Sequence, residues 1–362
     1  MYLKKLSLIN FKNLSQESLT LDRGINCFVG ANGTCKTNIV DAIYYLSMCK
    51  SALSMSDSQC VRFGESFFVI DGEYENARGR REQISCSFTK GGQKIMKRNG
   101  KPYKRLSEHV GVVPVVIVSP ADSVLVSDVA EERRRYINAF LSQLDSDYLA
   151  AMIRYNQALA ERNKYLKMGS AEEMLLIYDA QLESAAQKIH SARAAMVEQL
   201  QPVVAEYYRL ISGDREQVEL SYRSDLNGSS LSELLLASRQ RDIINGFTSC
   251  GVHRDDLLFT IGGVPLRKYG SQGQQKSFIV ALKLAQYHII AEQLGEVPIL
   301  LLDDVFDRLD EERVAKLVNV VSADNFGQIV ITDCSRERVE RLMKECAGGY
   351  RVFDVTYGKV LQ

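Results

Sequence analysis

The sequence predicts an α/β domain that is split along the chain by an α-helical hairpin. Short apolar runs bounded by turn residues, typical of buried strands, occupy both ends of the chain, and helical periodicity occupies its middle. Glycine is absent from 112 to 168 and again from 170 to 212, which favours long helices there. The expected division is an α/β part over 1–124 and 241–362, and a helical arm over 125–240.

The first hundred residues are predicted to be rich in β-structure with one helix. Alternating apolar residues predict strands at 3–11, 67–74 and 84–88, and a further strand within 19–29. The segment 38–49 fits a helix, and the nearly all-apolar run 112–118 fits a buried strand. Asn99-Gly100 lies between strand-like flanks and predicts a β-hairpin turn.

Two series of apolar residues in steps of three and four predict the helical hairpin. They run from Ile137 to Leu166 and from Leu175 to Tyr207, and the two helices are expected to join near Gly169-Ser170. About 35 residues at 1.5 Å each give an arm of about 50 Å. Pro202 is expected to kink or shorten the second helix. Predicted strands and helices then alternate again, with helices at 271–294 and 311–321 and strands at 257–261, 297–302 and 328–332.

Composition and charge exclude several classes of protein. Hydrophobic residues make up 46% of the 362 and charged residues 25%, which is ordinary for a globular chain. Lys plus Arg and Asp plus Glu both number 45, so the protein does not coat nucleic acid by bulk charge, although a local basic patch remains open. The eight cysteines form no C-x-x-C pair, and no apolar stretch reaches about 18 residues. With no signal-peptide pattern at the N-terminus, we expect a cytoplasmic protein with reduced thiols and no membrane attachment.

A phosphate-binding loop is predicted where an apolar strand ends and a helix begins. The backbone N–H groups of the loop and the helix N-terminus would surround the β- and γ-phosphates of ATP. Lys36 would neutralise phosphate charge, and the Thr37 hydroxyl would reach Mg²⁺. Cys35 stands where glycine usually precedes the lysine, so a chance match on a glycine-rich turn stays open, as does the effect on ATP affinity. The predicted loop consists of Gly30, Ala31, Asn32, Gly33, Thr34, Cys35, Lys36, Thr37 and Asn38.

An acidic pair at the end of a second apolar run fits the partner of such a loop. Asp303 would bind Mg²⁺ through water, and Asp304 would orient or deprotonate the attacking water. A buried strand that runs into a capped turn is the plainer explanation. Since both motifs occur in one chain in the expected order, the catalytic interpretation is favoured.

A third motif, Ser271-Gln272-Gly273-Gln274-Gln275, opens a helix 32 residues before Asp303. It resembles the S-x-G-Q signature of ABC-type ATPases, in which the serine hydroxyl and glycine backbone form a second phosphate site. In that family, two subunits enclose two ATP molecules, each between one subunit's loop and the other's signature. A simple N-cap is the alternative for Ser271. Phe306 to Asp310 matches the family's D-loop, and Thr332-Asp333 stands where the family carries its switch histidine, with a role that the sequence leaves open.

A basic cluster predicts contact with nucleic acid. Between Arg78 and Arg105 there are ten basic residues and one acidic residue, a net charge of +9 in a chain whose total is zero. Such a patch suits contact with phosphates without reading of bases, and a solvated strand face is the alternative. The hairpin is expected to present Lys94, Lys97, Arg98, Lys101, Lys104 and Arg105.

His253-Arg254-Asp255-Asp256 forms a compact polar group next to a predicted strand. Only four histidines exist, and none is spaced to complete a metal site around it. A structural hydrogen-bond network near the nucleotide interface is the expected role.

Taken together, these residues resemble the RecF family, a group of SMC-like ABC ATPases. The segments that carry the resemblance span almost the whole chain. Departures are Cys35 for glycine, Val252 where proline is usual, and Lys12 where arginine is common. The matching segments are NFKNL, GANGTCKTNIVDAIYYL, SPADSVLV, EERRRYIN, GVHRDDL, YGSQGQQKS and LLLDDVFDRLD.

The resemblance implies a clamp on double-stranded DNA and on single-strand/double-strand junctions at gaps. ATP and Mg²⁺ would drive homodimerisation, and slow, DNA-stimulated hydrolysis would release the clamp. RecO and RecR would be partners in loading RecA during gap repair, replication restart and SOS induction. By the same resemblance Lys36, Thr37 and Asp303 hold Mg-ATP, Asp304 serves hydrolysis, and Ser271, Gly273, Gln274 and Asp310 reach the partner's nucleotide, while the arm embraces DNA.

Four alternatives differ in testable ways. A transporter ATPase subunit places its signature about a hundred residues after the P-loop lysine, whereas here 235 residues separate Lys36 from Ser271. A long-armed SMC protein needs hundreds of heptad residues. A nuclease of the overcoming-lysogenisation type needs a further C-terminal domain with clustered carboxylates. A non-hydrolysing clamp, suggested by Cys35, is opposed by the intact acidic pair.

Overall fold

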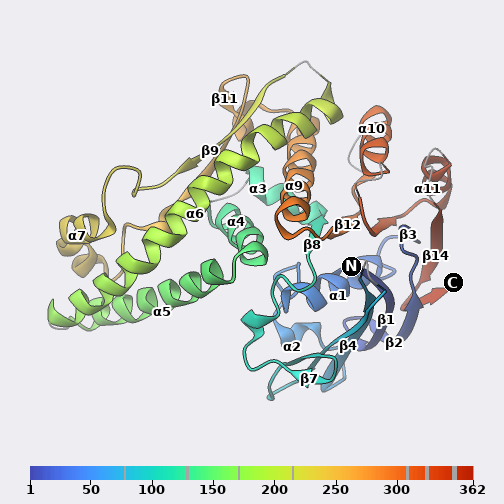
Figure 1. The fold of residues 1–362 in the computed structure, drawn as a ribbon, viewed down its shortest axis with the longest axis horizontal. Coiled ribbons are helices and arrows are strands. Elements are labelled where there is room, and N and C mark those ends of the chain that lie inside the picture. The colour runs from blue at the N-terminus through green and yellow to red at the C-terminus, as the bar shows by residue number, and fades with distance from the viewer. Residues whose placement is uncertain are drawn as a thin grey trace. The chain divides into compact units, whose positions relative to one another are not determined.

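The computed structural model describes residues 1–76, 79–127, 130–169, 172–213, 216–306, 310–322, 326–344 and 349–361. The chain divides into two compact units (Figure 1). The head unit comprises Met1–Ser123, Tyr207–Arg215 and Ser271–Gln362, and the arm unit comprises Val124–Glu206 and Glu216–Gly270. The second boundary falls at Gly270 rather than at 240, because β10 (Asp256–Ile261) pairs along its whole length with β9 (Val218–Arg223).

One sheet of the head unit has the strand order β15-β14-β3-β13-β12-β8. All neighbours in it are parallel except β14 and β15. Every residue of β3, β12 and β13 is buried, as expected for strands covered on both faces. The carboxyl ends of these three strands therefore meet at one edge. The strands are β3 (Ile25–Val29), β8 (Val115–Val118), β12 (Ile299–Asp303), β13 (Ile329–Asp333), β14 (Tyr350–Thr356) and β15 (Lys359–Leu361).

A second, antiparallel sheet of the head unit has the order β2-β1-β4-β5-β6-β7. Its β6–β7 connection is the predicted hairpin, with Asn99 at φ 52° and Gly100 at φ 79°, the two positive φ values of a type I′ turn. The predicted strands in the first ninety residues are confirmed, except that 19–29 divides between β2 and β3. The strands are β1 (Tyr2–Phe11), β2 (Leu14–Thr20), β4 (Phe67–Glu75), β5 (Arg81–Thr89), β6 (Ile95–Arg98) and β7 (Lys101–Pro102).

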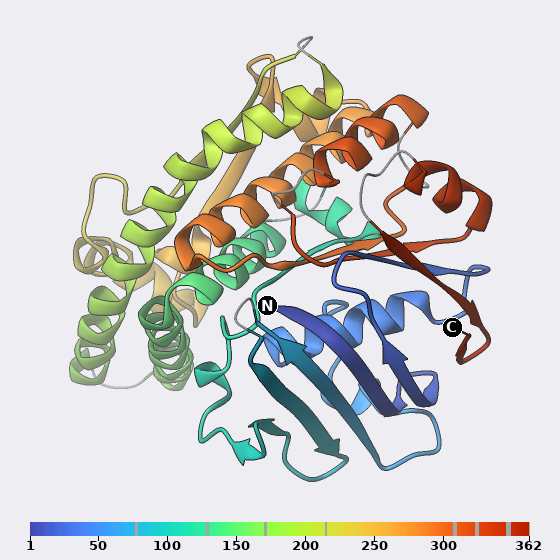
Figure 2. The same ribbon diagram turned by 45° about the vertical axis from the view of Figure 1, so that its right-hand side comes forward.

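Helix α1 (Lys36–Met48) lies between the two sheets and contacts strands of both, as Figure 2 shows. This position explains why buried apolar residues occupy several sides of the helix, including Ile39, Val40 and Tyr45. Helix α9 (Gln272–Leu294) packs on β8. The remaining helical elements of the head unit are α2 (Asp57–Cys60), η1 (Leu106–Glu108), η2 (Pro120–Ser123), α10 (Glu311–Val321) and α11 (Arg336–Met343).

The arm unit contains the predicted helical hairpin. Helix α5 (Ser146–Met168) ends at Gly169, whose φ of 62° is the left-handed cap that glycine favours, and α6 (Glu172–Ser212) follows. Ser170, the other residue predicted at the joint, lies outside the described residues. A three-stranded sheet, β11-β10-β9, completes the unit. Its other elements are α3 (Val124–Ser127), α4 (Ala130–Leu144), α7 (Leu231–Asn245), η3 (Val252–Arg254), β11 (Val264–Pro265) and α8 (Leu266–Tyr269).

The hairpin departs from one prediction and from part of a second. The series from Ile137 to Leu166 forms two helices, α4 and α5, because the Asp145 carboxylate accepts hydrogen bonds from the backbone N–H groups of Asp147 and Tyr148 and so begins a new helix. Pro202 does not shorten α6, which continues ten residues further to Ser212.

The described cysteines, all but Cys346, are free thiols. Within the described part of the chain, no helix has both the length and the apolar character needed to cross a bilayer.

Candidate nucleotide-binding site

The predicted phosphate-binding loop connects β3 to α1 at the carboxyl edge of the parallel sheet. Gly30 has no room for a side chain, because a Cβ there would lie 2.2 Å from the carbonyl oxygen of Val355 on β14. Gly33 has a φ of 83°, a conformation that glycine adopts without strain. The two glycines therefore serve different needs, close packing on a strand and a left-handed turn.

Lys36 is held by the carbonyl oxygens of its own loop. Its side chain is buried, and its Nζ donates hydrogen bonds to the carbonyl oxygens of Gly30 at 2.8 Å and Ala31 at 3.0 Å. The Thr34 hydroxyl also donates to the Ala31 carbonyl, at 2.8 Å. These bonds place the positive charge at a cavity of about 410 Å³, which is lined by Asn13, Asn32, Gly33, Cys35, Lys36, Thr37, Asn38, Pro120 and Asp304.

Cys35 is strained in this loop. It caps α1 with φ 82° and ψ 13°, and its side chain makes no capping hydrogen bond. A side chain in this left-handed region costs about 1–2 kcal/mol relative to the right-handed one. The thiol also lines the cavity where phosphates are expected. Cysteine in place of glycine therefore strains the backbone and also places a side chain in the cavity where phosphates are expected.

Cys35→Gly is expected to tighten ATP binding about 3- to 10-fold and to raise the melting temperature by about 2–4 °C, because it removes both the strain and the side chain. Calorimetric titration and thermal unfolding measure the two effects. Cys35→Ala is the matched control, since it removes only the sulfur and keeps the strain. Unchanged affinity and stability in Cys35→Gly would contradict this account.

The acidic pair meets the loop as predicted. Asp303 ends β12, and its Oδ1 accepts hydrogen bonds from the hydroxyls of Thr37 at 3.1 Å and Thr332 at 2.8 Å. The same Thr332 hydroxyl accepts a bond from the Asp304 N–H at 3.0 Å. Burial, together with the neighbouring Asp304, raises the pKa of Asp303 above its usual range, and the two hydroxyls partly offset this.

The donor set around Asp303 fits Mg²⁺. Carboxylate and hydroxyl oxygens are hard ligands of the kind that Mg²⁺ prefers together with phosphate oxygens and water. A buried carboxylate with a raised pKa is also the kind of group that a cation stabilises in its charged form. Thr37 and Asp303 are therefore the residues that would hold the ion.

Thr332 and Asp333 have separate roles in the structure. Thr332 joins Asp303 to Asp304 through its hydroxyl, which follows from the parallel pairing of Asp303 with Thr332 in the sheet. The Asp333 carboxylate instead forms an ion pair with the Arg338 guanidinium at 2.8 Å and accepts a hydrogen bond from the Ser335 N–H at 2.6 Å. Its carbonyl accepts the Gly30 N–H at 3.2 Å, so the end of β13 supports the phosphate-binding loop.

The signature motif begins α9 as predicted. Ser271 is the N-cap, its hydroxyl accepts the Gln274 N–H at 3.2 Å, and the Gln274 side chain accepts the Ser271 N–H in return. Ser271 is exposed, and Gly273 and Gln274 are half-buried. Of the predicted D-loop, Phe306 is buried and Asp310 is the exposed N-cap of α10, whereas Asp307, Arg308 and Leu309 lie outside the described residues.

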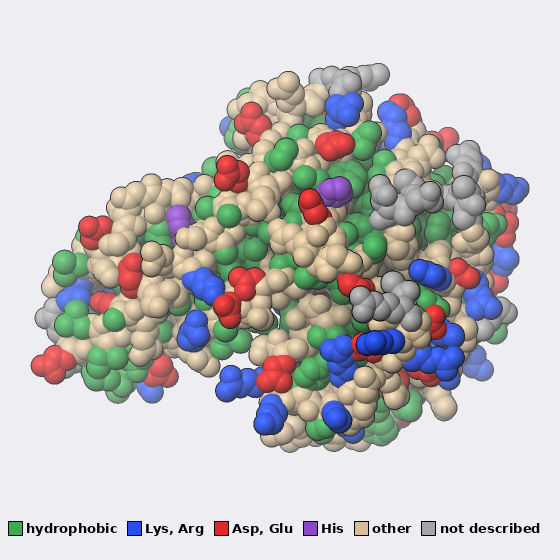
Figure 3. Space-filling view, viewed as in Figure 1, with side chains coloured by type: hydrophobic (Ala, Val, Ile, Leu, Met, Phe, Trp, Pro, Cys, Tyr) green, Lys and Arg blue, Asp and Glu red, His purple; other side chains and the backbone are tan. Residues whose placement is uncertain are grey.

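The basic hairpin divides into two groups of side chains. Lys94 is largely buried and pairs with Asp57 at 2.9 Å, while Arg98 pairs with Glu82 through two nitrogens. The other four predicted residues are exposed, and none of them forms an ion pair with a described residue. Basic side chains gather over this part of the head unit in Figure 3. The four exposed cations are Lys97, Lys101, Lys104 and Arg105.

The polar group in the arm unit is a structural hydrogen-bond network, as predicted. Asp255 pairs with the buried Arg193 at 2.5 Å, and Asp256 pairs with Arg133 at 2.7 Å. His253 lies between the hydroxyl of Tyr155 at 2.8 Å and the carbonyl of Thr248 at 3.0 Å. Since a carbonyl only accepts, the Nε2–H of His253 donates to Thr248 and its Nδ1 accepts from Tyr155.

Acid is expected to destabilise the protein through His253. Burial lowers the pKa of His253 to about 4, so the folded protein binds fewer protons than the unfolded chain between pH 4 and 6.5. The free energy of unfolding should therefore fall as the pH drops through this window, by up to about 1.4 kcal/mol per pH unit. Urea unfolding at pH 7 to 5 should show a shallower dependence for His253→Gln, whereas His190→Gln, at a surface hydrogen bond to Asn227, should keep the wild-type slope. Equal slopes in all three proteins would exclude His253 as the cause.

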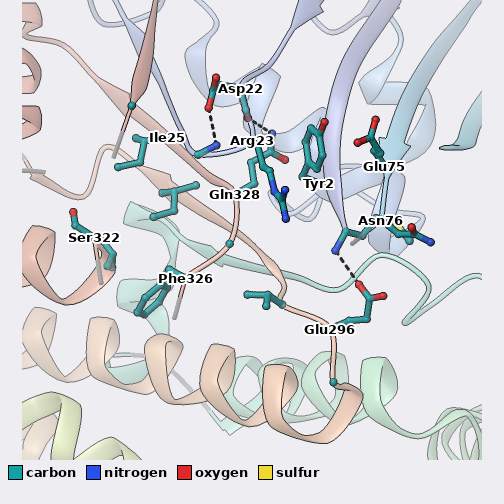
Figure 4. Close-up of a pocket in the computed structure, with 18 residues that line it drawn as sticks. Tyr2, Asp22, Arg23, Ile25, Glu75, Asn76, Glu296, Ser322, Phe326 and Gln328 are labelled. Atoms are coloured by element: carbon teal, nitrogen blue, oxygen red, sulfur yellow. Dashed lines mark hydrogen bonds and ion pairs between the residues drawn. The ribbon is translucent and has the colours of Figure 1, made fainter. Parts of the chain in front are cut away.

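A cavity of about 600 Å³ lies at the opposite, amino-terminal ends of β3 and β13 (Figure 4). Arg23, Tyr2 and Gln328 line it, and the N-terminal ammonium group pairs with Glu296 at its rim at 2.8 Å. None of the predicted site residues lies in it. The cavity at the phosphate-binding loop is smaller, but it is the one lined by Lys36, Thr37 and Asp304.

Sequence reasoning assigned no site role to two residues and left the role of a third, Thr332, open. Asn13 and Pro120 line the cavity from loops distant in sequence, and no spacing rule connects them to the P-loop. The function of Thr332 depends on strand pairing, which only the order of strands in the sheet reveals. In the sequence, the one indication for Thr332 was its position directly after an apolar run.

Comparison with known proteins agrees with this geometry. Residues 2–356 match the family model described as the RecF/RecN/SMC N terminal domain. The DNA replication and repair protein RecF of Bacteroides thetaiotaomicron is 45% identical over 362 residues, with 99% of this chain and 98% of that protein covered. The protein of the same name from Flavobacterium johnsoniae is 44% identical over 360 residues and covers 98% of this chain and 100% of its own length.

Solved structures of two proteins are also similar to this chain. The recombination mediator protein RecF, solved with ATP and described as part of the RecFOR pathway, superimposes with a TM-score of 0.89 at 31% identity and covers 99% of this chain and 97% of its own. The Smc head domain of Pyrococcus furiosus, with a TM-score of 0.59 at 18% identity and coverage of 99% and 96%, shares the fold. The chain belongs to the RecF family, within the RecF/RecN/SMC group of ABC-type ATPases.

Proposed function

We propose that this protein is an ATP-dependent DNA clamp of recombinational repair. It dimerises on binding ATP and Mg²⁺, holds double-stranded DNA and single-strand/double-strand junctions at gaps, and hydrolyses ATP slowly, with DNA as a stimulant. With RecO and RecR it promotes loading of RecA in gap repair, replication restart and SOS induction, in the cytoplasm. The names of its relatives, which associate them with DNA repair and with ATP, support this assignment.

One observation carries the dimer mechanism. The cavity at the loop contains Lys36, Thr37 and Asp304, and its described lining includes neither Ser271 nor Gly273. Ser271 is exposed at the start of α9, where a hydroxyl and a helix N-terminus can receive an anion. A second copy of the chain that supplies its own signature to this cavity would enclose the nucleotide. The two phosphate-binding halves then act only when two copies meet.

Each residue has a defined task in this mechanism. Lys36 and the loop N–H groups bind the β- and γ-phosphates, and the partner copy's serine and glycine close over the γ-phosphate. Asp304 lies at the cavity and orients or deprotonates the attacking water. Thr37 and Asp303 would hold Mg²⁺, which neutralises charge on the transferring phosphoryl group when bound. Gln274 and Asp310 fix the first turns of α9 and α10 by capping them.

Analytical ultracentrifugation with and without Mg-ATP tests the proposal. We expect a monomer without nucleotide and a dimer with it, and we expect Lys36→Ala to stay monomeric. A protein that binds ATP, shown separately by titration, but stays monomeric at that concentration is not a clamp of this kind. A dimer that forms and never turns over ATP would favour the alternative, a non-hydrolysing clamp, for which the strain at Cys35 is the motivating observation.

Charge reversal of Lys97, Lys101 and Lys104 is expected to weaken DNA binding. The slope of the logarithm of the association constant against the logarithm of salt concentration should fall in magnitude by about one per lysine, because each lysine that contacts a phosphate releases counterions from the DNA. Lys94 and Arg98 are left intact, since their ion pairs stabilise the fold. Fluorescence anisotropy at several salt concentrations measures both effects. Reversal of Lys344 and Lys359, exposed lysines of the head unit that form no ion pair with a described residue, is the control. An unchanged salt slope in the triple variant would remove the hairpin as the DNA contact.

A further inference from the structure

Arg313 lies directly against the signature motif. It is the third residue of α10, and a Cβ placed on Gly273 would come within 2.4 Å of the Arg313 Nη1 and 3.5 Å of its Cζ. The guanidinium therefore occupies the space that a side chain at position 273 would need, and glycine lets it approach the backbone of α9. The first turns of α9 and α10 meet at this contact.

The guanidinium is held in one orientation. Arg313 Nε pairs with Asp310 Oδ2 at 3.3 Å, and Asp310 Oδ1 accepts the backbone N–H of Arg313 at 2.9 Å. The aspartate thus fixes one edge of the guanidinium, while Nη1 on the other edge faces Gly273. The Arg313 side chain is 23% exposed and the Asp310 side chain 59%, so the group is accessible from outside the head unit.

This arrangement suits a phosphate. An arginine fork binds phosphate oxygens through parallel N–H donors, and its charge persists at any physiological pH. The first turn of α9 carries no acidic residue that would compete for it. Ser271, whose hydroxyl begins the same turn, is exposed as well.

We propose that Arg313 binds the γ-phosphate of the ATP molecule held by a second copy of the chain, next to Ser271 and Gly273. The proposal rests on the composite site described above and adds to it a cation supplied in trans. Arginines that reach a transferring phosphoryl group from a partner stabilise its developing charge and accelerate hydrolysis strongly. Asp310 is then a positioning residue, because it acts by orienting Arg313.

Mixed dimers test whether Arg313 acts in trans. Asp304→Asn, which should keep ATP binding and dimerisation, and Arg313→Gln should each alone hydrolyse ATP at less than about 5% of the wild-type rate. In an equimolar mixture half of the dimers are mixed, and each has one site with an intact Asp304 facing an intact Arg313. The mixture should therefore recover up to about a quarter of the wild-type rate. An Arg313 that acted on its own chain's nucleotide would give no recovery. An Arg313 that only joined α9 to α10 would recover as well, and a lowered melting temperature in Arg313→Gln would identify that role.

Further variants separate the two proposals. A mixture of Asp304→Asn with Ser271→Arg tests the composite site without changing Arg313. If it recovers activity and the Arg313 mixture does not, the role of Arg313 is overturned and the clamp stands; if neither recovers, both proposals fail. Arg313→Lys keeps the charge and should retain more activity than Arg313→Gln, with the same melting temperature. Arg341→Gln, at an exposed arginine of α11, should behave as wild type, and wild-type hydrolysis by Arg313→Gln alone would refute the inference.

Discussion

Asp303→Asn is expected to make the ligand-free protein more stable and to abolish its response to Mg-ATP. The pKa of Asp303 is raised in the folded protein, mainly by burial, so the folded state binds this proton more tightly than the unfolded chain does. Ionisation of Asp303 therefore lowers the free energy of unfolding as the pH rises above the unfolded pKa. Asparagine removes that charge and keeps an oxygen that can accept the hydroxyls of Thr37 and Thr332.

The same substitution removes the charged ligand of Mg²⁺. Wild-type protein at a Mg-ATP concentration 100 times its Kd should gain about 2.7 kcal/mol of stability, and the variant should gain almost none. Thermal unfolding with and without Mg-ATP measures both effects in one series. Asp225→Asn, an exposed aspartate of the arm unit, makes the same charge change away from the site and is the control. A lower melting temperature for ligand-free Asp303→Asn, or a retained shift with Mg-ATP, would show that Asp303 has another role.

Much of the head unit could be predicted because its strands are short, apolar and bounded by turn residues. The run before Asp303 and the run before Thr332 are buried along their whole length, so their sequences carry a clear signal. The loop motif also has local context, a strand before it and a helix after it, and this context identified Lys36 and Thr37. Asp303 followed from the order of motifs along the chain.

The remaining features depend on contacts that no local pattern contains. Asp145 starts a new helix through two hydrogen bonds, although the apolar spacing continues across it. Lys94 is a residue of the type that contacts DNA, but it forms an ion pair with Asp57, 37 residues earlier. Arg98 forms an ion pair with Glu82, the one acidic residue of the cluster, on the neighbouring strand. Counting charges therefore located the basic surface and overstated the number of cations available for DNA. Arg313 showed no signal at all, because its role depends on the meeting of two helix ends.

Asp304→Asn is expected to lower the rate of ATP hydrolysis by at least about 100-fold while leaving ATP binding intact. Asp304 has a φ of 48°, in the left-handed region, and asparagine tolerates this region better than most residues. Its backbone N–H bond to Thr332 also survives the change. The variant therefore removes the base and preserves the fold of the site, which alanine at the same position would not do.

Because the dimer is released by hydrolysis in the proposed mechanism, Asp304→Asn should remain dimeric on ATP long after the wild type has returned to monomer. Phosphate release and ultracentrifugation over time measure the two effects on the same sample. Thr332→Val is an informative companion, since it removes the hydroxyl that joins Asp303 to Asp304 and should slow hydrolysis less than Asp304→Asn does. Hydrolysis at the wild-type rate in Asp304→Asn would place the base elsewhere. A variant that still binds ATP by titration but neither hydrolyses it nor dimerises would show that Asp304 is needed for clamp closure rather than for nucleotide capture.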